Sequence, residues 1–233
     1  MERFGKYAML AGFVVLLLLL LYYYRRVFSS GENDRTRFAA RAGVFGALCA
    51  VLYIVPVFQI KVPFLPAFME IHFDEIPAFI AGFAYGPWTA LSAIFIKTIL
   101  KIPFSSTLTV GEWADFLFGI VFVLPASLLY RKKRNLRGVI SGFLISIVLE
   151  LLVSALFNVY VFLPFYMNVM GLPYERILAL CQVANSNVTN LGWPYVLYCV
   201  LPLNAIKDVS VIVVTFFVYR HIHNLLPDRT SKK

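Results

Sequence analysis

Charged side chains are scarce in this sequence. Only 14% of its 233 residues are Asp, Glu, Lys or Arg, whereas 61% are hydrophobic. Soluble domains average about 25% charged and about 45–50% apolar residues. The composition therefore excludes an ordinary soluble domain and indicates an integral membrane protein. Because a spanning helix needs about 20 residues, roughly six or seven spans fill the chain and leave no room for a soluble domain.

Common enzyme motifs are also missing. The chain has no G-x-x-x-x-G-K-[ST] phosphate loop, so it cannot hydrolyse ATP by that route. It has no H-E-x-x-H and no G-x-S-x-G motif. Its three cysteines, Cys49, Cys181 and Cys199, have no metal-like or redox spacing, and we expect them to pack as small hydrophobic residues. We therefore expect no catalytic residues, no metal and no cofactor.

Acidic residues are fewer than basic ones, 12 against 21, so the net charge is +9. Lysine and arginine concentrate at 25–41, at 131–137 ("RKKRNLR") and from 220 to the end. These clusters flank apolar runs, as cytoplasmic loops do under the positive-inside rule. No aromatic residues interleave with them as in a nucleic-acid surface. We expect a multi-pass protein of the plasma membrane, with its basic loops and carboxyl terminus in the cytoplasm and no nucleic-acid partner.

The first apolar run, 7–24, ends in three tyrosines, is followed by two arginines and has no small-x-small cleavage site. We interpret 1–30 as a retained transmembrane helix rather than a signal peptide. The segment 38–220 is then a six-helix membrane domain, and 221–233 is a basic cytoplasmic tail. The predicted fold is all-α, a six-helix bundle preceded by one extra helix.

Within the membrane domain the apolar runs predict spans, and the longest connection, 164–194, is expected to be an external loop. The runs 76–85 and 88–100 are short, which predicts a tilted or re-entrant pair around Gly86. The predicted spans are 38–58, 76–85, 88–100, 114–130, 138–163 and 195–219.

Lys207 and Asn204 lie near the middle of the last predicted span, in "PLNAIKD". A lysine there costs roughly 2.5–3.5 kcal/mol on insertion, so its presence needs a reason. Spaced three apart, the two residues share one helix face. Either they contact a ligand, or Lys207 pairs with a carboxylate and holds two helices together. Asn158, in 138–163, is a second intramembrane amide, which alone would be typical of an interhelical hydrogen bond.

Two amides and an ammonium group would suit one kind of ligand if they converge. A planar heterocycle of the flavin or pteridine type has alternating carbonyl and imide groups on its edge, and an asparagine can donate and accept there at once. Helical periodicity does not prove that the three residues meet.

Three carboxylates invite other interpretations. Glu112 and Asp115 could act as an acid–base pair, but acids in the first turn of a helix also complement its dipole. Glu150, in an apolar span, is interpreted as a structural partner of Lys97 or Lys207 rather than as a proton relay.

Two apolar patterns could serve binding. "PFLPAFME" carries Phe64, Leu65 and Phe68 between prolines, as in a loop anchored at the membrane interface or a lid over an external cavity. Small residues recur every four positions in "AARAGVFGALCA", which permits close helix packing, either within this chain or against a partner subunit. One stripe is Ala39, Gly43 and Ala47, and the other is Ala42, Gly46 and Ala50.

Over roughly 38–220 the chain resembles the substrate-binding S components of energy-coupling-factor (ECF) vitamin transporters, specifically the riboflavin-binding type. The resemblance is strongest in 62–119, in "VPFLPAFMEIHFDEIPAFIAGFAYGP", "IKTIL" and "VGEWADFLFG", and continues in "NVYVFLPFY" and "PLNAIK". His72, Glu75, Asp115 and Asp208 depart from the family pattern, and the extra first helix is not part of it.

The resemblance implies a six-helix bundle that binds riboflavin from outside. It implies that Asn158, Asn204 and Lys207 contact the isoalloxazine ring and that the 62–75 loop closes over it. Gly43 and Ala47 would dock onto a membrane-embedded T subunit, two ABC-type ATPases would supply energy, and the bundle would reorient in the membrane. Alternatives are another vitamin ligand (FMN, folate, thiamin or pyridoxine), a membrane enzyme, or a purely structural subunit.

Overall fold

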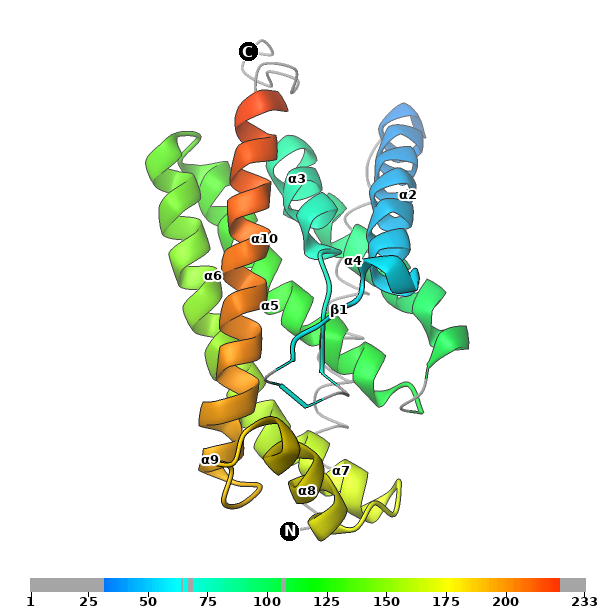
Figure 1. Cartoon of the computed structure of the whole chain (residues 1–233). Coiled ribbons are helices and arrows are strands. Elements are labelled where there is room, and N and C mark those ends of the chain that lie inside the picture. The colour runs from blue at the N-terminus through cyan, green and yellow to red at the C-terminus, as the bar shows by residue number, and fades with distance from the viewer. Residues whose placement is uncertain (1–31, 64, 67–68, 106–107, 223–233) are drawn as a thin grey trace. The chain divides into compact units, whose positions relative to one another are not determined.

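The structure, a computed structural model, is predominantly helical (Figure 1). It describes residues 32–63, 65–66, 69–105 and 108–222. The predicted extra helix at 1–30 and nearly all of the predicted tail lie outside these residues. The chain forms two compact units. Of the described residues, the first contains those within 32–40, 61–69 and 152–203, and the second contains those within 41–60, 70–151 and 204–222.

The second unit is built on α3 (Glu75–Tyr85), α4 (Pro87–Lys101) and α5 (Val110–Lys132), which pack against one another. Gly86 joins α3 to α4 with φ +104°, a left-handed conformation that glycine adopts without the steric cost of a Cβ atom. Pro87 then starts α4, where its missing N–H is not needed. The predicted pair of short helices around Gly86 is confirmed.

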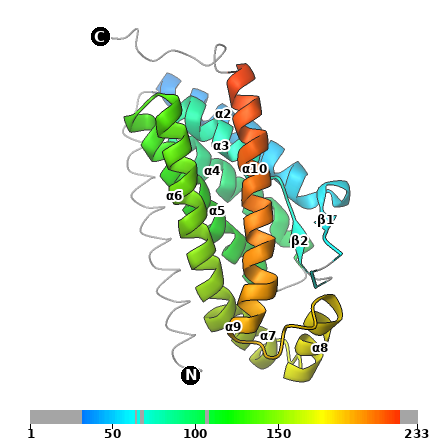
Figure 2. The ribbon, with the colours of Figure 1, turned by 60° about the vertical axis from the view of Figure 1, so that its left-hand side comes forward.

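The second unit also contains the greater part of each of three longer helices. These are α2 (Glu32–Ile54), α6 (Leu136–Phe157) and α10 (Leu201–Ile222). Figure 2 shows α6 and α10 running side by side, and residues of both line one apolar groove. The core is aromatic, because Phe79 of α3 packs edge-on against Phe122 of α5 and Phe143 of α6. Phe83, one turn later, reaches the ring of Tyr219 on α10.

Two short 3₁₀ helices and a small sheet lie in the connections. η1 (Pro56–Phe58) follows α2, and η2 (Ile102–Phe104) follows α4. β1 (Ile60–Lys61) and β2 (Glu70–Ile71) form a two-stranded sheet. The residues that connect β1 to β2 include most of the predicted "PFLPAFME" loop. Leu65 of this loop is buried, and Phe64 and Phe68 lie outside the described residues.

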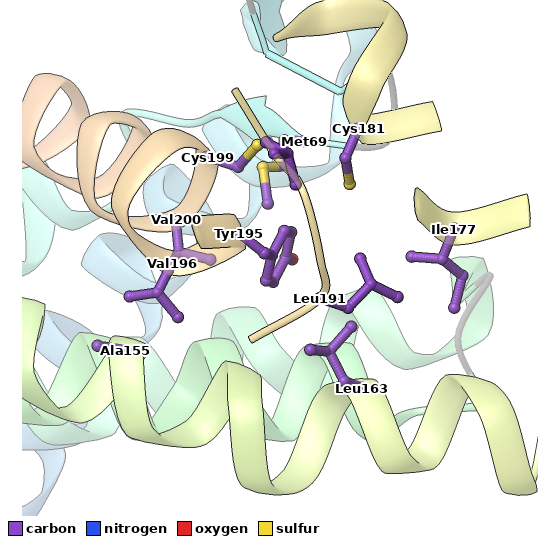
Figure 3. Packing of buried hydrophobic residues seen from close by; sticks show 11 residues of the cluster. Met69, Ala155, Leu163, Ile177, Cys181, Leu191, Tyr195, Val196, Cys199 and Val200 are labelled. Atoms are coloured by element: carbon purple, nitrogen blue, oxygen red, sulfur yellow. The ribbon is translucent and has the colours of Figure 1, made fainter. Parts of the chain in front are cut away.

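The first unit contains α7 (Leu163–Asn168), α8 (Tyr174–Ala184) and α9 (Trp193–Tyr195), together with two π-helical segments, η3 (Asn158–Phe162) and η4 (Val196–Val200). Its core includes Tyr195, Leu163 and Cys199, whose side chains gather in Figure 3. The predicted external loop at 164–194 is thus largely helical. Cys181, assigned to that loop, is buried in α8.

The π-helical segments have a cause in the sequence. A proline in a regular helix clashes with the carbonyl group four residues earlier. Pro164 and Pro202 place that clash at Tyr160 and Tyr198, and these two residues lie in η3 and η4 respectively. The wider π turn relieves the clash and lets the helices continue. The helix from Leu136 therefore runs on to Asn168, past the predicted end at 163.

Among the described residues, four helices are long and apolar enough to cross a membrane: Asp34–Ile54, Val110–Lys132, Leu136–Asn168 and Trp193–His221. They correspond to the four longer predicted spans. α5 begins at Val110, four residues before the predicted start at 114, so "VGE" belongs to the helix rather than to a loop.

We predict that Gly142→Leu lowers the free energy of unfolding by about 1–3 kcal/mol through overpacking. A Cβ atom at Gly142 of α6 would lie 2.8 Å from the Cα atom of Ala126 on α5, so the two helices would have to separate. Unfolding in detergent measures the effect. Gly43→Leu is the control, since a Cβ atom there meets nothing within 4 Å. Equal stability of the two variants would contradict this account of the α5–α6 packing.

Candidate ligand-binding site

Lys207 and Asn204 lie one turn apart on α10, and both are buried, with 6% and 8% of their surfaces exposed. The Lys207 Nζ atom donates a hydrogen bond of 2.9 Å to Oε1 of Glu75. The amide of Asn204 forms no hydrogen bond with the part of the chain that the structure describes. One of the two polar groups thus has a protein partner, and the other has an unused donor and acceptor.

Glu75 is the first residue of α3, where the helix dipole favours a negative charge. Its second carboxylate oxygen, Oε2, is buried and accepts no hydrogen bond within the described ranges. The alternative that Lys207 pairs with a carboxylate is therefore confirmed, but the partner is Glu75. The expectation that Glu150 forms this pair is wrong, because neither of its oxygens has a hydrogen-bond partner among the described residues.

Lys97 of α4 is fully buried and pairs with two carboxylates. It bonds to Asp74, which immediately precedes α3, and to Oδ2 of Asp115 on α5 at 2.7 Å. Its ammonium group also lies 4.7 Å from the ring centre of Tyr53, a favourable cation–π distance. The expected alternative pair of Lys97 with Glu150 is also wrong.

Adjacent residues at the start of α3 therefore anchor both lysines: Asp74 binds Lys97, and Glu75 binds Lys207. Asp115, expected either to act in acid–base chemistry or to complement a helix dipole, is instead an ion-pair partner of Lys97, which the sequence did not predict. The sequence does contain a feature that points to this pairing: the acidic residues of "FDE" directly precede one apolar run, and the next apolar run contains a lysine. Glu112, the other member of the proposed acid pair, accepts a hydrogen bond of 2.7 Å from the Ser105 hydroxyl.

His72 lies beside this network. Its ring packs edge-on against Tyr53, with 5.0 Å between ring centres. Burial lowers the pKa of His72, so the imidazole is neutral at pH 7. Its buried Nδ1 atom has no hydrogen-bond partner among the described residues. His72 therefore contributes polarity without a fixed positive charge.

Asn158 belongs to the first unit and is the first residue of η3. Its Nδ2 donates to the carbonyl oxygen of Ser154 at 2.9 Å, and its Oδ1 accepts from the Tyr195 hydroxyl at 3.3 Å. These two bonds fix the orientation of the amide, yet one amide hydrogen and one lone pair remain. Because Asn204 and Lys207 belong to the second unit, the convergence of the three residues stays a prediction.

The two small-residue stripes of α2 have different surroundings. Ala42, Gly46 and Ala50 are buried, and a Cβ atom at Gly46 would lie 2.7 Å from Ile96 of α4. Gly43 and Ala47 are exposed, next to the exposed apolar side chains of Val44 and Leu48. The stripe of Ala42, Gly46 and Ala50 serves packing within the chain, as one alternative predicted. The described residues leave the apolar helix face around Gly43 and Ala47 exposed.

A family model described as "ECF transporter, substrate-specific component" matches residues 37–219, so the chain belongs to that family. The family consists of transporter components, not enzymes. The expected resemblance to S components is therefore confirmed.

Two curated relatives are named as riboflavin transporters. The chain is 28% identical over 179 residues to riboflavin transporter RibU of Staphylococcus aureus (strain TCH60), covering 77% of this chain and 88% of RibU. It is 25% identical over 179 residues to riboflavin transporter FmnP of Bacillus subtilis (strain 168), covering 76% and 88%. A solved structure, "Structure and mechanism of the S component of a bacterial ECF transporter", aligns with a TM-score of 0.65 at 25% identity, covering 83% of this chain and 99% of that one.

We predict that Lys97→Met lowers the free energy of unfolding by about 3–5 kcal/mol, because it leaves the buried Asp74 and the partly buried Asp115 without a cation. Thermal unfolding in detergent measures the loss, with Lys133→Met, at an exposed lysine, as control. Adding Asp74→Asn to Lys97→Met should recover part of the stability. If Lys97→Met is as stable as Lys133→Met, the ion pairs do not stabilise the fold.

Proposed function

We propose that this chain binds riboflavin from outside the cell and delivers it inward as the substrate-binding subunit of an ATP-driven ECF importer. The names of its two relatives support the choice of ligand. Within the chain, the observation that carries the proposal is the unused, buried amide of Asn204 beside the ammonium group of Lys207. A polar ligand that pairs with this amide would gain about 0.5–1.5 kcal/mol for each hydrogen bond.

The chemistry of riboflavin suits these groups. Its isoalloxazine ring presents an imide N–H between two carbonyl groups, and the Asn204 amide can accept from the N–H while it donates to a neighbouring carbonyl. Lys207 uses one of its three donors on Glu75 and keeps two for a ring oxygen or nitrogen. Asn158, with one free amide hydrogen, is proposed as the third contact.

Apolar residues are proposed to cover the ring. Leu65 is 3% exposed, and it lies between Pro63 and Pro66 in the predicted lid. We propose that Phe64, Leu65 and Phe68 pack on the flavin and exclude water, which strengthens the hydrogen bonds to its polar edge. The two prolines restrict the backbone of this segment before it closes, so closing costs less conformational entropy.

The exposed stripe of α2 is the proposed docking face. Gly43 and Ala47 leave room for another helix to approach closely, and the neighbouring exposed apolar side chains would contact it. We propose that a membrane-embedded T subunit packs on this face and that two ABC-type ATPases drive the reorientation of the bundle.

We predict that Asn204→Ala and Lys207→Ala each raise the Kd for riboflavin more than tenfold, about 1.4 kcal/mol or more, because each removes donors to the ring. Quenching of flavin fluorescence on titration of the purified protein measures the Kd. Asn187→Ala, at an exposed asparagine, is the control and should bind like the wild type. Tighter binding of FMN, folate, thiamin or pyridoxine than of riboflavin would contradict the choice of ligand.

We predict that Gly43→Trp leaves riboflavin binding unchanged but prevents assembly with the T subunit, since the indole fills the space that a close helix needs. Co-purification with the T subunit and riboflavin uptake by cells test this. Leu128→Trp, at an exposed position of α5, is the control for a bulky residue on the membrane face. Normal uptake by the Gly43→Trp variant would refute the docking face.

A further inference from the structure

Four buried polar side chains on α6 and α10 of the second unit form a group that we call the polar seam. Ser146 and Glu150 lie one turn apart on α6, and Asp208 and Thr215 lie two turns apart on α10. All four side chains are fully buried. The residues that directly flank these four along the two helices are apolar, except for Lys207.

The two carboxyl groups of the seam interact with each other. Nevertheless all four of their oxygens, together with the hydroxyls of Ser146 and Thr215, lack a hydrogen-bond partner within the described ranges. An ionised carboxylate only accepts hydrogen bonds, so two of them cannot bond to each other. With one proton between them, one group becomes a donor and the other its acceptor.

The charges that face the pair do not neutralise it. Lys207 of α10, Glu75 of α3 and Asp115 of α5 act on Glu150, and Lys207, Glu75 and Glu150 act on Asp208. Lys207 is bonded to Glu75, and Lys97 is bonded to Asp74 and Asp115. The two lysines thus already serve three carboxylates, and two further ionised groups would be uncompensated in a low-dielectric interior.

We propose that Glu150 and Asp208 form a proton-binding site, in which the two carboxyl groups share one proton at neutral pH. The shared proton gives the pair an internal hydrogen bond and removes one negative charge from beside Lys207. Glu75 then remains the ion-pair partner of Lys207, and the Lys207 ammonium group keeps the donors that it does not use on Glu75. Like carboxyl dyads in general, the pair titrates as a unit.

Infrared spectroscopy of the purified full chain without ligand tests the site directly. We expect a carboxylic-acid C=O band at pH 7 that shifts in D₂O and disappears in both Glu150→Gln and Asp208→Asn. Glu112→Gln is the control, since Glu112 is buried but accepts a hydrogen bond from Ser105, and it should keep the band. A wild-type spectrum that contains no band sensitive to Glu150→Gln or Asp208→Asn would overturn the proposal.

The pH dependence of stability gives a second readout. In the unfolded chain both carboxyls are ionised at pH 7, so the folded protein binds one more proton. Its stability should then fall as pH rises, by up to tenfold in the folding equilibrium per pH unit. Glu150→Gln and Asp208→Asn should flatten this slope relative to Glu112→Gln. Identical slopes in all four proteins would overturn the proposal.

The same measurements distinguish a proton from an alkali cation. Replacing Na⁺ and K⁺ by choline should change neither the infrared band nor the melting temperature. A melting temperature that rises with Na⁺ in the wild type but not in Asp208→Asn, without a carboxylic-acid band, would show that a cation occupies the seam instead. None of these readouts involves riboflavin, so their outcome is independent of the proposed function.

Discussion

The neutralisation of charge inside an apolar bundle is the constraint on which the second unit depends. An isolated ammonium group in such surroundings costs several kcal/mol, and two lysines are buried in the helices of this unit. Asp74 and Glu75, adjacent at the start of α3, bind Lys97 and Lys207 and so tie α3 to α4 and to α10. One short acidic segment, placed where the α3 dipole favours negative charge, therefore fixes the approach of helices that are distant in sequence.

The same network includes the residues of the proposed ligand site. The bond to Glu75 holds Lys207 in place and uses only one of its donors, while Asn204, one turn away, has an unused amide. A site of this kind is oriented before a ligand arrives, which reduces the entropy lost on binding. In the first unit, the π-helical segment that starts at Asn158 and the hydroxyl of Tyr195 orient a second amide in the same way.

Much of the fold could be predicted from the sequence, because hydrophobic runs and basic loops mark membrane spans directly. The turn at Gly86 followed directly from "YGP", and Lys207 and Asn204 stood out as polar residues in an apolar run. The ion-pair partners could not be predicted: Glu75 and Lys207 are 132 residues apart, and Glu150 was an equally acceptable partner for either lysine until the helices were placed. The helix α8 was missed because 164–194 contains prolines and glycines that are typical of loops.

The central claim is that Lys207 and Asn204 bind the polar edge of a flavin while Glu75 holds the lysine. A structure of the chain determined with riboflavin bound tests it most directly. The account predicts the isoalloxazine ring within hydrogen-bonding distance of the Asn204 amide and of Lys207 Nζ, with the Lys207–Glu75 bond intact. A flavin bound elsewhere, with both side chains facing lipid or only other protein groups, would contradict it.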